Sequence, residues 1–151
     1  MKVKDIMTRE VVSVLPGASI EEIAKVLVEN KISGVPVVDD VGNLVGIVSE
    51  GDLLHKEVSP QVPDIVNILG AFIFYNGVER YNEEVKKLMA RSAEEIMTSK
   101  VVTIEEDMEV SKACQLMMKH QIKRIPVMKG WQLVGIISRV DVIKTLINKS
   151  I

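Results

Sequence analysis

One stretch of the sequence occurs twice, and this repetition constrains the fold more than any other feature. Leu44 to Asp52 reads LVGIVSEGD, and Leu133 to Asp141 reads LVGIISRVD. Each copy predicts a buried apolar strand that runs directly into Ser-x-x-Asp and then into apolar residues at helical spacing. The chain is therefore expected to contain two similar units, each with a strand that ends at the N-terminus of a helix.

The Ser-x-x-Asp sequence has two interpretations. In the first it only shapes the chain: Ser49 and Ser138 are N-caps, and Asp52 and Asp141 close a capping box with them. In the second the same turn also binds a ligand, because a hydroxyl, backbone N–H groups and the positive end of the helix dipole all favour phosphate there. One copy alone would favour the first interpretation, whereas two copies justify aligning the whole chain with itself.

The repeat extends well beyond this stretch. Ile96-Met97-Thr98 repeats Ile6-Met7-Thr8, and the register continues through an apolar helical stripe, a strand that contains Pro-Val, and the final strand. Each unit reads as strand, helix, strand, strand, helix, with too little chain to bury its own apolar face. We expect residues 1–57 and 93–151 to be two repeats that pack together with approximate twofold symmetry.

The segment from 58 to 92 belongs to neither copy. Its apolar residues fall at helical spacing, and Glu79 to Met89 has the pattern of a charged amphipathic helix. We therefore predict a helical insertion, with one apolar face formed by Ile65, Ile68, Leu69, Phe72 and Ile73. This face would either lie back on its own domain or contact another subunit, and the two alternatives are equally consistent with the sequence.

Composition excludes several functions. Cys114 is the only cysteine, and His55 and His120 lie far apart, so neither a disulfide nor a metal site is expected. The net charge of −2 and the 3% of aromatic residues argue against a nucleic-acid partner. The longest apolar run is too short to span a bilayer and no signal peptide is evident, which predicts a cytoplasmic protein without a membrane partner. Because no nucleophile–base pair or glycine-rich phosphate loop is present, we do not expect an enzyme.

The repeated pattern resembles a known family. The sequences DIMT, VVSV, VPVVD and LVGIVSEGDLL recur as EIMT, VVTI, RIPV and LVGIISRVDVI. This pattern is similar to a free-standing tandem pair of cystathionine β-synthase (CBS) domains, also called a Bateman module. The resemblance covers nearly the whole chain except His55 to Ser92. It implies an α+β fold in which two β-α-β-β-α repeats, related by a pseudo-twofold axis, pack through their sheets.

The same resemblance implies a regulatory function. Modules of this family bind adenosine-containing ligands, namely AMP, ADP, ATP or S-adenosylmethionine, in two clefts between the repeats. They regulate an enzyme, channel or transporter and are not catalysts, so no cofactor is required. The family also implies a homodimer, and a free-standing pair must act on a separate regulated protein. The alternative is a pair that has lost its ligand and serves only dimerisation or protein interaction.

The resemblance assigns the two aspartates to the ribose of the ligand. A carboxylate suits this role because it can accept hydrogen bonds from both ribose hydroxyls. The twofold axis is expected to bring the Ser-x-x-Asp of one repeat to the segment before the proline of the other, with adenine against the apolar residues. The main nucleotide cleft would then contain Ile47, Ser49, Asp52, Ile122, Lys123, Arg124 and Arg139, and the second cleft Ile32, Ser33, Gly34, Ile136, Ser138 and Asp141.

The two clefts are expected to differ in charge. Lys123, Arg124 and Arg139 would meet in the Asp52 cleft and form a site for a phosphate chain. The Asp141 cleft would receive Glu50 instead and would contain no cation. Phosphate-bearing nucleotides should therefore prefer the Asp52 cleft, and the Asp141 cleft should be weaker, empty or filled by a less anionic adenosine ligand. A solvated turn is the alternative interpretation of the Lys-Arg pair.

Overall fold

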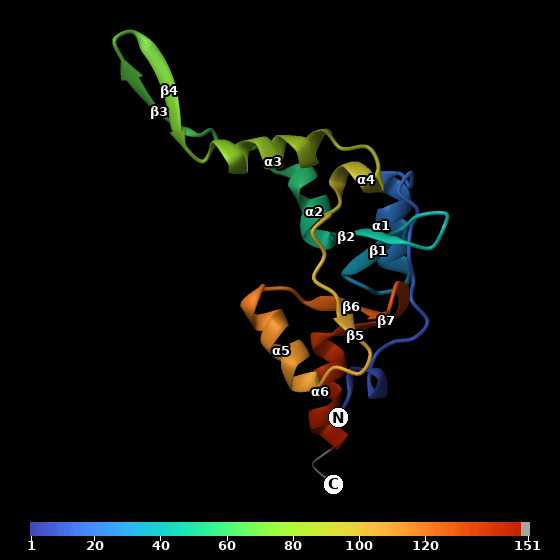
Figure 1. Ribbon diagram of the computed structural model, residues 1–151. Helices are drawn as coiled ribbons and strands as arrows, with labels where there is room; N and C mark the ends of the chain where they lie inside the picture. Colours follow the sequence, from blue (N-terminus) through green and yellow to red (C-terminus); the bar gives the residue numbers. More distant parts are fainter. Residues whose placement is uncertain (149–151) are drawn as a thin grey trace.

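The structure, a computed structural model, describes residues 1–148 as two halves and a projecting arm (Figure 1). The first half contains α1 (Ile20–Glu29), β1 (Gly34–Val38), β2 (Leu44–Ser49) and α2 (Glu50–Leu54). The second half contains β5 (Ile104–Glu105), α5 (Val110–Lys119), β6 (Arg124–Lys129), β7 (Gln132–Ser138) and α6 (Arg139–Asn148). The predicted α+β fold of two similar repeats is confirmed. Within residues 1–148, no helix is both long enough and apolar enough to cross a membrane.

Each half is built on an antiparallel hairpin with the same register. β1 pairs with β2 so that Gly34 lies opposite Ser49, and β6 pairs with β7 so that Arg124 lies opposite Ser138. A short extended segment joins each hairpin in parallel: residue Val14 bridges to β1, and β5 pairs with β6. The serine of each Ser-x-x-Asp therefore lies beside the first residue of the neighbouring strand in its own repeat.

The first helix of the first half begins at a capping box formed by Ser19 and Glu22. Ser19 Oγ accepts a hydrogen bond from the Glu22 backbone N–H at 3.1 Å, and the Glu22 carboxylate accepts one from the Ser19 N–H at 3.2 Å. This capping box starts α1, which buries Ile23 and Leu27 against the hairpin.

The two repeats exchange the segments that begin them. Thr8 exchanges two backbone hydrogen bonds of 2.9 Å with Ile136 of the second half. In the same way, Thr98 exchanges bonds of 2.9 and 3.0 Å with Ile47 of the first half. Each hairpin therefore pairs with a segment that precedes the other repeat in the sequence.

The exchange also completes the two hydrophobic cores. Val3 and Met7 lie in the core of the second half, together with Ile104, Ala113, Met117, Ile125, Val127 and Ile137. Ala93 and Ile96 of the short helix α4 (Ala93–Ile96) lie in the core of the first half, together with Val14, Ala18, Ile23, Leu27, Val35, Val37, Val48 and Ala90. The first turn of the chain, η1 (Val3–Asp5), docks on the second half in the position that α4 takes on the first. Neither core is complete without residues from outside its own repeat.

Glycines in the repeated stretch make room for the exchanged methionines. A Cβ added at Gly135 would lie 2.5 Å from Met7 Sδ and 3.1 Å from the Thr8 carbonyl oxygen. A Cβ added at Gly46 would overlap Met97 in the same manner. The glycine in each copy of the stretch is therefore required by close packing rather than by a turn.

The insertion differs from the prediction. Residues 64–76 form a hairpin of β3 (Asp64–Ile68) and β4 (Ala71–Asn76), not a helix. The connection explains the difference, because Leu69 and Gly70 both have positive φ, 52° and 82°, which matches the twist of a two-residue hairpin turn. The helix predicted from residue 79 is confirmed as α3 (Val78–Met89), and a short turn, η2 (His55–Glu57), joins α2 to the insertion.

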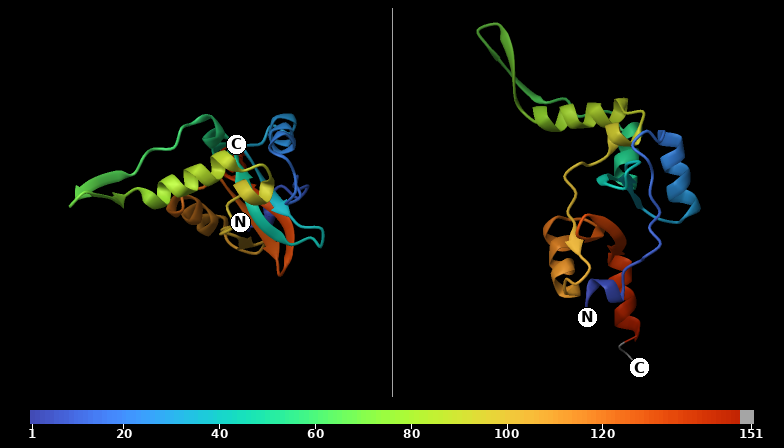
Figure 2. Two further views of the ribbon diagram at one scale, coloured as in Figure 1. Left: turned by 90° about the horizontal axis from the view of Figure 1, so that it is seen from above. Right: turned by 45° about the vertical axis from the view of Figure 1, so that its right-hand side comes forward.

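The hairpin of the insertion projects from the molecule as an arm. Figures 1 and 2 show it extending beyond both halves, and every residue of β3 and β4 is exposed. Of the two alternatives for this apolar segment, the one in which it lies back on its own domain is therefore wrong, and a contact with another subunit stays a prediction. Within residues 1–148 the arm leaves the apolar side chains of Leu69 and Phe72 in solvent.

Gly135→Ala is expected to destabilise the protein by about 1–3 kcal/mol, because the added methyl group overpacks the Met7 contact. Urea unfolding of the full chain measures the change. Gly17→Ala is the matched control, since nothing lies within 4 Å of a Cβ at that position, and its effect should stay within about 0.5 kcal/mol. Equal losses for the two variants would contradict the packing role of Gly135.

Candidate functional site

The turn from β7 into α6 holds Asp141 by one carboxylate oxygen. Asp141 Oδ2 accepts hydrogen bonds from the Ser138 backbone N–H at 2.7 Å and from Ser138 Oγ at 2.8 Å. The Asp141 N–H donates back to Ser138 Oγ at 3.3 Å. This is the predicted capping box. No group in the described part of the chain bonds to Asp141 Oδ1, so that oxygen keeps its acceptor capacity.

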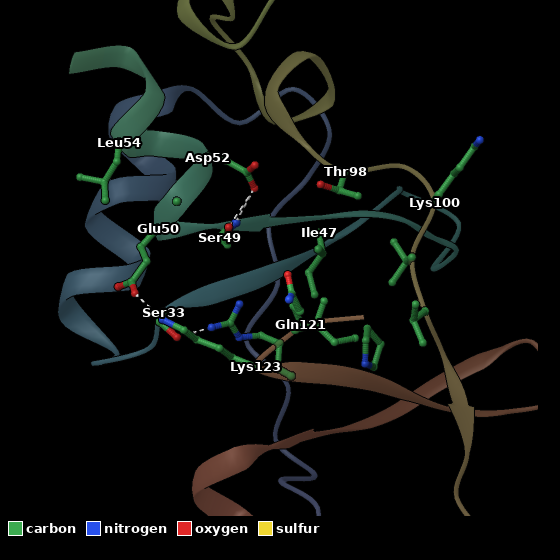
Figure 3. Close-up of a pocket in the computed structure, with 16 residues that line it drawn as sticks. Ser33, Ile47, Ser49, Glu50, Asp52, Leu54, Thr98, Lys100, Gln121 and Lys123 are labelled. Atoms are coloured by element: carbon green, nitrogen blue, oxygen red, sulfur yellow. Dashed lines mark hydrogen bonds and ion pairs between the residues drawn. The ribbon is translucent and has the colours of Figure 1, made fainter. Parts of the chain in front are cut away.

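The turn from β2 into α2 holds Asp52 in the same way but adds a partner. Asp52 Oδ2 accepts from the Ser49 N–H at 2.8 Å and from Ser49 Oγ at 3.1 Å (Figure 3). Its other oxygen, Oδ1, accepts from the ammonium of Lys87 on α3. The Asp52 side chain is only 7% exposed and that of Lys87 23%. The two turns therefore differ through a residue that lies outside both repeats.

A second lysine fixes the end of α3 that carries Lys87. Lys56 Nζ donates to the carbonyl oxygens of Leu88 at 2.8 Å and Ala90 at 2.5 Å, and more weakly to that of Lys87 at 3.4 Å. These carbonyls lie at the C-terminal end of the helix, where a cation also interacts favourably with the helix dipole. The bonds hold the last turn of α3 beside α2.

A cavity of 440 Å³ lies between the halves beside Asp52 (Figure 3). It brings together every residue predicted for this cleft except Arg139, and it combines Ser49 and Asp52 of one repeat with Ile122 to Arg124 of the other. The residues that line it and were not predicted for this cleft are Ser33, Glu50, Gly51, Leu54, Thr98, Lys100, Val101, Val102, Gln121 and Pro126. The residues from 98 to 102 reach the cavity because they follow the exchanged segment.

A second cavity, of 620 Å³, lies beside Asp141. The second cavity is lined by all six residues assigned to the second nucleotide cleft, though not by Glu50, and again the Ser-x-x-Asp of one repeat meets the segment before the proline of the other. Three residues line both cavities: Ser33, Lys123 and Arg124. The residues that sequence reasoning did not place here include Thr8, Glu10, Val12, Asn30, Lys31, Pro36, Arg139, Val140 and Lys144.

The expected distribution of charge is wrong in part. Lys123 and Arg124 line the Asp52 cavity as predicted, but they also line the Asp141 cavity, and Arg139 and Glu50 each lie in the opposite cavity from the one expected. Arg139 lines the Asp141 cavity, where its Nε donates to the Ile122 carbonyl oxygen at 3.1 Å. Glu50 lines the Asp52 cavity and pairs with Lys123 at 3.2 Å. The residue after each serine is the first of its helix, and it faces the cleft of its own aspartate rather than crossing the twofold axis. Five cations line the Asp141 cavity, namely Lys31, Lys123, Arg124, Arg139 and Lys144, together with the carboxylates of Asp141 and Glu10. Three cations line the Asp52 cavity, namely Lys100, Lys123 and Arg124.

Arg124 lies between the two cavities. Its Nη2 donates to Ser33 Oγ of the first repeat, and a Cβ added at Gly34 would overlap the guanidinium. Gly34 is therefore the position that admits the arginine. Burial lowers the pKa of Arg124 from its ordinary value, while the Glu50 and Asp52 carboxylates act in the opposite direction. A guanidinium has five N–H donors, so Arg124 retains donors for an anion.

Two pseudo-symmetric β-α-β-β-α halves with a Ser-x-x-Asp turn in each cleft define a CBS domain pair. The CBS domain description matches residues 3–59 and 93–148, and the chain belongs to this family. Among residues 1–148, no group of histidine, cysteine, aspartate and glutamate side chains is placed to hold a metal ion.

Similar proteins share nearly the whole chain. Protein MJ1426 of Methanocaldococcus jannaschii is 33% identical over 157 residues, which cover 97% of this chain and 92% of that protein. The CBS domain pair of protein MJ0100, solved with 5′-methylthioadenosine and S-adenosyl-L-methionine, is 27% identical with a TM-score of 0.73 and covers 99% of this chain and 98% of its own. CBSX2, solved with AMP, has a TM-score of 0.75 at 24% identity, with the same coverage, and shows the same fold. This chain matches 58% of the full chloroplast protein CBSX2 of Arabidopsis thaliana.

Asp52→Asn is expected to destabilise the protein by about 1–3 kcal/mol more than Asp141→Asn, because only Asp52 loses an ion pair with a lysine. An asparagine oxygen can still accept from the serine in both turns, so the capping bonds are matched. Urea unfolding of the two variants measures the difference, and high salt should reduce it only slightly, since the pair is largely buried. Equal destabilisation would mean that the Lys87 pair contributes nothing.

Proposed function

We propose that this protein is a regulatory module that binds an adenine nucleotide between its two CBS repeats, in the Asp141 cleft. The single observation that carries the proposal is the position of Asp141. A carboxylate with one oxygen unused lies at a helix N-terminus, in a cavity of ligand size lined by five cations.

Asp141 supplies the chemistry that ribose requires. Each carboxylate oxygen has two acceptor positions, and the Ser138 bonds use those of Oδ2. Oδ1 can then accept from both hydroxyls of a vicinal diol at once. Charge-assisted bonds of this kind are about twice as strong as neutral ones. The capping box holds the side chain in one orientation before a ligand arrives, which lowers the entropic cost of binding.

The cations supply the chemistry that phosphate requires. Arg139 is the first residue of α6, beside backbone N–H groups and the positive end of the helix dipole. Lys144 lies one helical turn beyond Asp141. Arg124, the first residue of β6, and Lys123, which precedes it, line the same cavity. Arginine can bind a phosphate with two parallel hydrogen bonds. This revises the preference expected from the sequence: phosphate-bearing ligands should favour the Asp141 cleft.

The apolar walls of the same cavity suit an adenine ring. Ile136 of β7 and Ile32, which precedes β1, line it from opposite repeats. The adenosine compounds bound by the CBS pair of MJ0100 support an adenosine ligand here. S-adenosylmethionine is the alternative ligand, but its sulfonium charge is disfavoured beside five cations. AMP, ADP or ATP fits the charge of the site better.

Ligand occupancy is transmitted to a partner protein through the contacts that join the halves. The Lys123–Glu50 pair of 3.2 Å and the Arg124–Ser33 bond both cross between repeats, and a bound phosphate would compete for both cations. Such coupling is reciprocal, so a partner that changes the fit of the halves changes nucleotide affinity equally. Exposed apolar side chains on α2 and α6 offer a surface for a homodimer: Leu54, Val140, Ile143 and Ile147.

Asp141→Asn is expected to weaken AMP binding about 10- to 100-fold, since two charge-assisted bonds to ribose are lost. Isothermal titration with AMP, ADP, ATP and S-adenosylmethionine measures the effect. Asp52→Asn is the matched control and should leave the strongest binding event unchanged. Loss of that event with Asp52→Asn instead would place the nucleotide in the other cleft. Absence of binding by every ligand would favour the alternative, a CBS pair that serves only protein interaction.

Arg139→Gln is expected to weaken ATP binding about tenfold or more while adenosine binding stays nearly constant, because the guanidinium acts only on phosphate. Titrations of the variant with both ligands separate the two effects. Lys100→Gln, which removes a cation from the Asp52 cavity, is the control. An equal loss for ATP and adenosine would show that Arg139 supports the shape of the cleft rather than the phosphate.

A further inference from the structure

We propose that Lys87, from the insertion between the repeats, determines whether the Asp52 cleft admits a ribose. This inference rests on the proposed function, because it assumes that the aspartate of each Ser-x-x-Asp binds ribose. It adds a specificity residue that lies outside both repeats, and it assigns different ligand requirements to two clefts that contain the same motif.

The number of free acceptor positions distinguishes the two aspartates. A carboxylate offers about four, and the serine bonds use two of them at each turn. Lys87 takes a third position at Asp52, on Oδ1. One position then remains at Asp52 and two at Asp141. A ribose that donates both hydroxyls needs two, so it can bind Asp52 fully only after Lys87 has left.

Burial of Asp52 and the hydrogen bonds of Lys56 both stabilise the Asp52–Lys87 ion pair. Asp52 is 7% exposed, so its charge is poorly solvated and depends on the ammonium. Lys56 holds the carbonyls around Lys87 in place and keeps the ammonium within reach. A ligand that displaces Lys87 must therefore replace a charge–charge contact with hydroxyl donors. This cost lowers the affinity of the Asp52 cleft for every adenosine ligand relative to the Asp141 cleft.

Lys87 is nevertheless able to leave without unfolding a core. Its side chain is 23% exposed, and no residue of α3 is buried. Displacement would move the last turn of α3, and the first turn of the same helix follows directly from β4 of the exposed arm (Figure 1). By reciprocity, whatever restrains α3 also tunes ribose binding at Asp52.

The test isolates the Asp52 cleft by using the full chain with Asp141→Asn. Adenosine is the probe, because it has no phosphate whose affinity would respond to the lost charge. Lys87→Met in this background is expected to raise adenosine affinity at least tenfold. Lys86→Met, at the exposed neighbouring position on α3, is the matched control and should leave the affinity unchanged. Titration with 2′,3′-dideoxyadenosine should show no gain from Lys87→Met.

The outcomes separate the two proposals. Equal adenosine affinity in the Lys87 and Lys86 variants, or an equal gain for dideoxyadenosine, would overturn the role of Lys87. If, in that case, the unmodified protein still binds AMP through Asp141, the proposed function is kept and only the role of Lys87 is rejected. If no variant and no unmodified protein binds any adenosine ligand, both proposals fail. Circular dichroism checks folding, and Lys87→Gln, whose amide can still donate to Asp52, replaces Lys87→Met if that variant unfolds; a smaller gain is then expected.

Discussion

The exchange of the segments that begin the two repeats is the constraint on which the rest of this structure depends. Thr8 pairs with Ile136 and Thr98 pairs with Ile47, so each hairpin gains backbone hydrogen bonds from a segment outside its own repeat. The exchanged side chains also complete each core. Neither half can bury its apolar face alone, and the two therefore fold as one unit. Because the clefts lie where the halves meet, the same exchange brings together the two repeats that line them.

The elements of the fold follow from the repetition, but their partners do not. Alignment of the chain with itself identifies two similar units, yet it does not indicate which copy of a segment packs on which half. The exchange becomes visible only in the structure, in the Thr8–Ile136 and Thr98–Ile47 hydrogen bonds and in the close approach of Met7 to Gly135. The sequence predicts a helix for the arm because five of its apolar residues fall at helical spacing, but a short apolar run of this kind is equally compatible with a strand. Leu69-Gly70 forms the turn that a more typical Asn-Gly would have signalled.

The sequence predicts most of the residues that line the two cavities, but it does not predict how the charged side chains are divided between them. Pseudo-twofold symmetry indicates which repeats meet, and every predicted residue except Arg139 and Glu50 lines its expected cavity. Symmetry does not indicate the side of a helix on which its first residue lies, and for this reason Arg139 and Glu50 exchange their predicted places. Lys87 gives no signal in the sequence, because it lies 35 residues from Asp52 in a segment without a counterpart.

That missing counterpart is the physical origin of the difference between the two aspartates. Both Ser-x-x-Asp turns use the same serine bonds, so the repeats alone would leave the two carboxylates with the same partners, although the clefts around them differ in their lining cations. The insertion occurs once, between the repeats, and brings α3 back against α2, where one ammonium meets one of the two aspartates. Within the described residues, the Asp141 carboxylate is held by Ser138 and has no ion-pair partner, whereas the Asp52 carboxylate is held by Ser49 and forms an ion pair with Lys87. Two sites with a single motif can then respond to the same ligand at different concentrations, which is the property that a graded sensor needs.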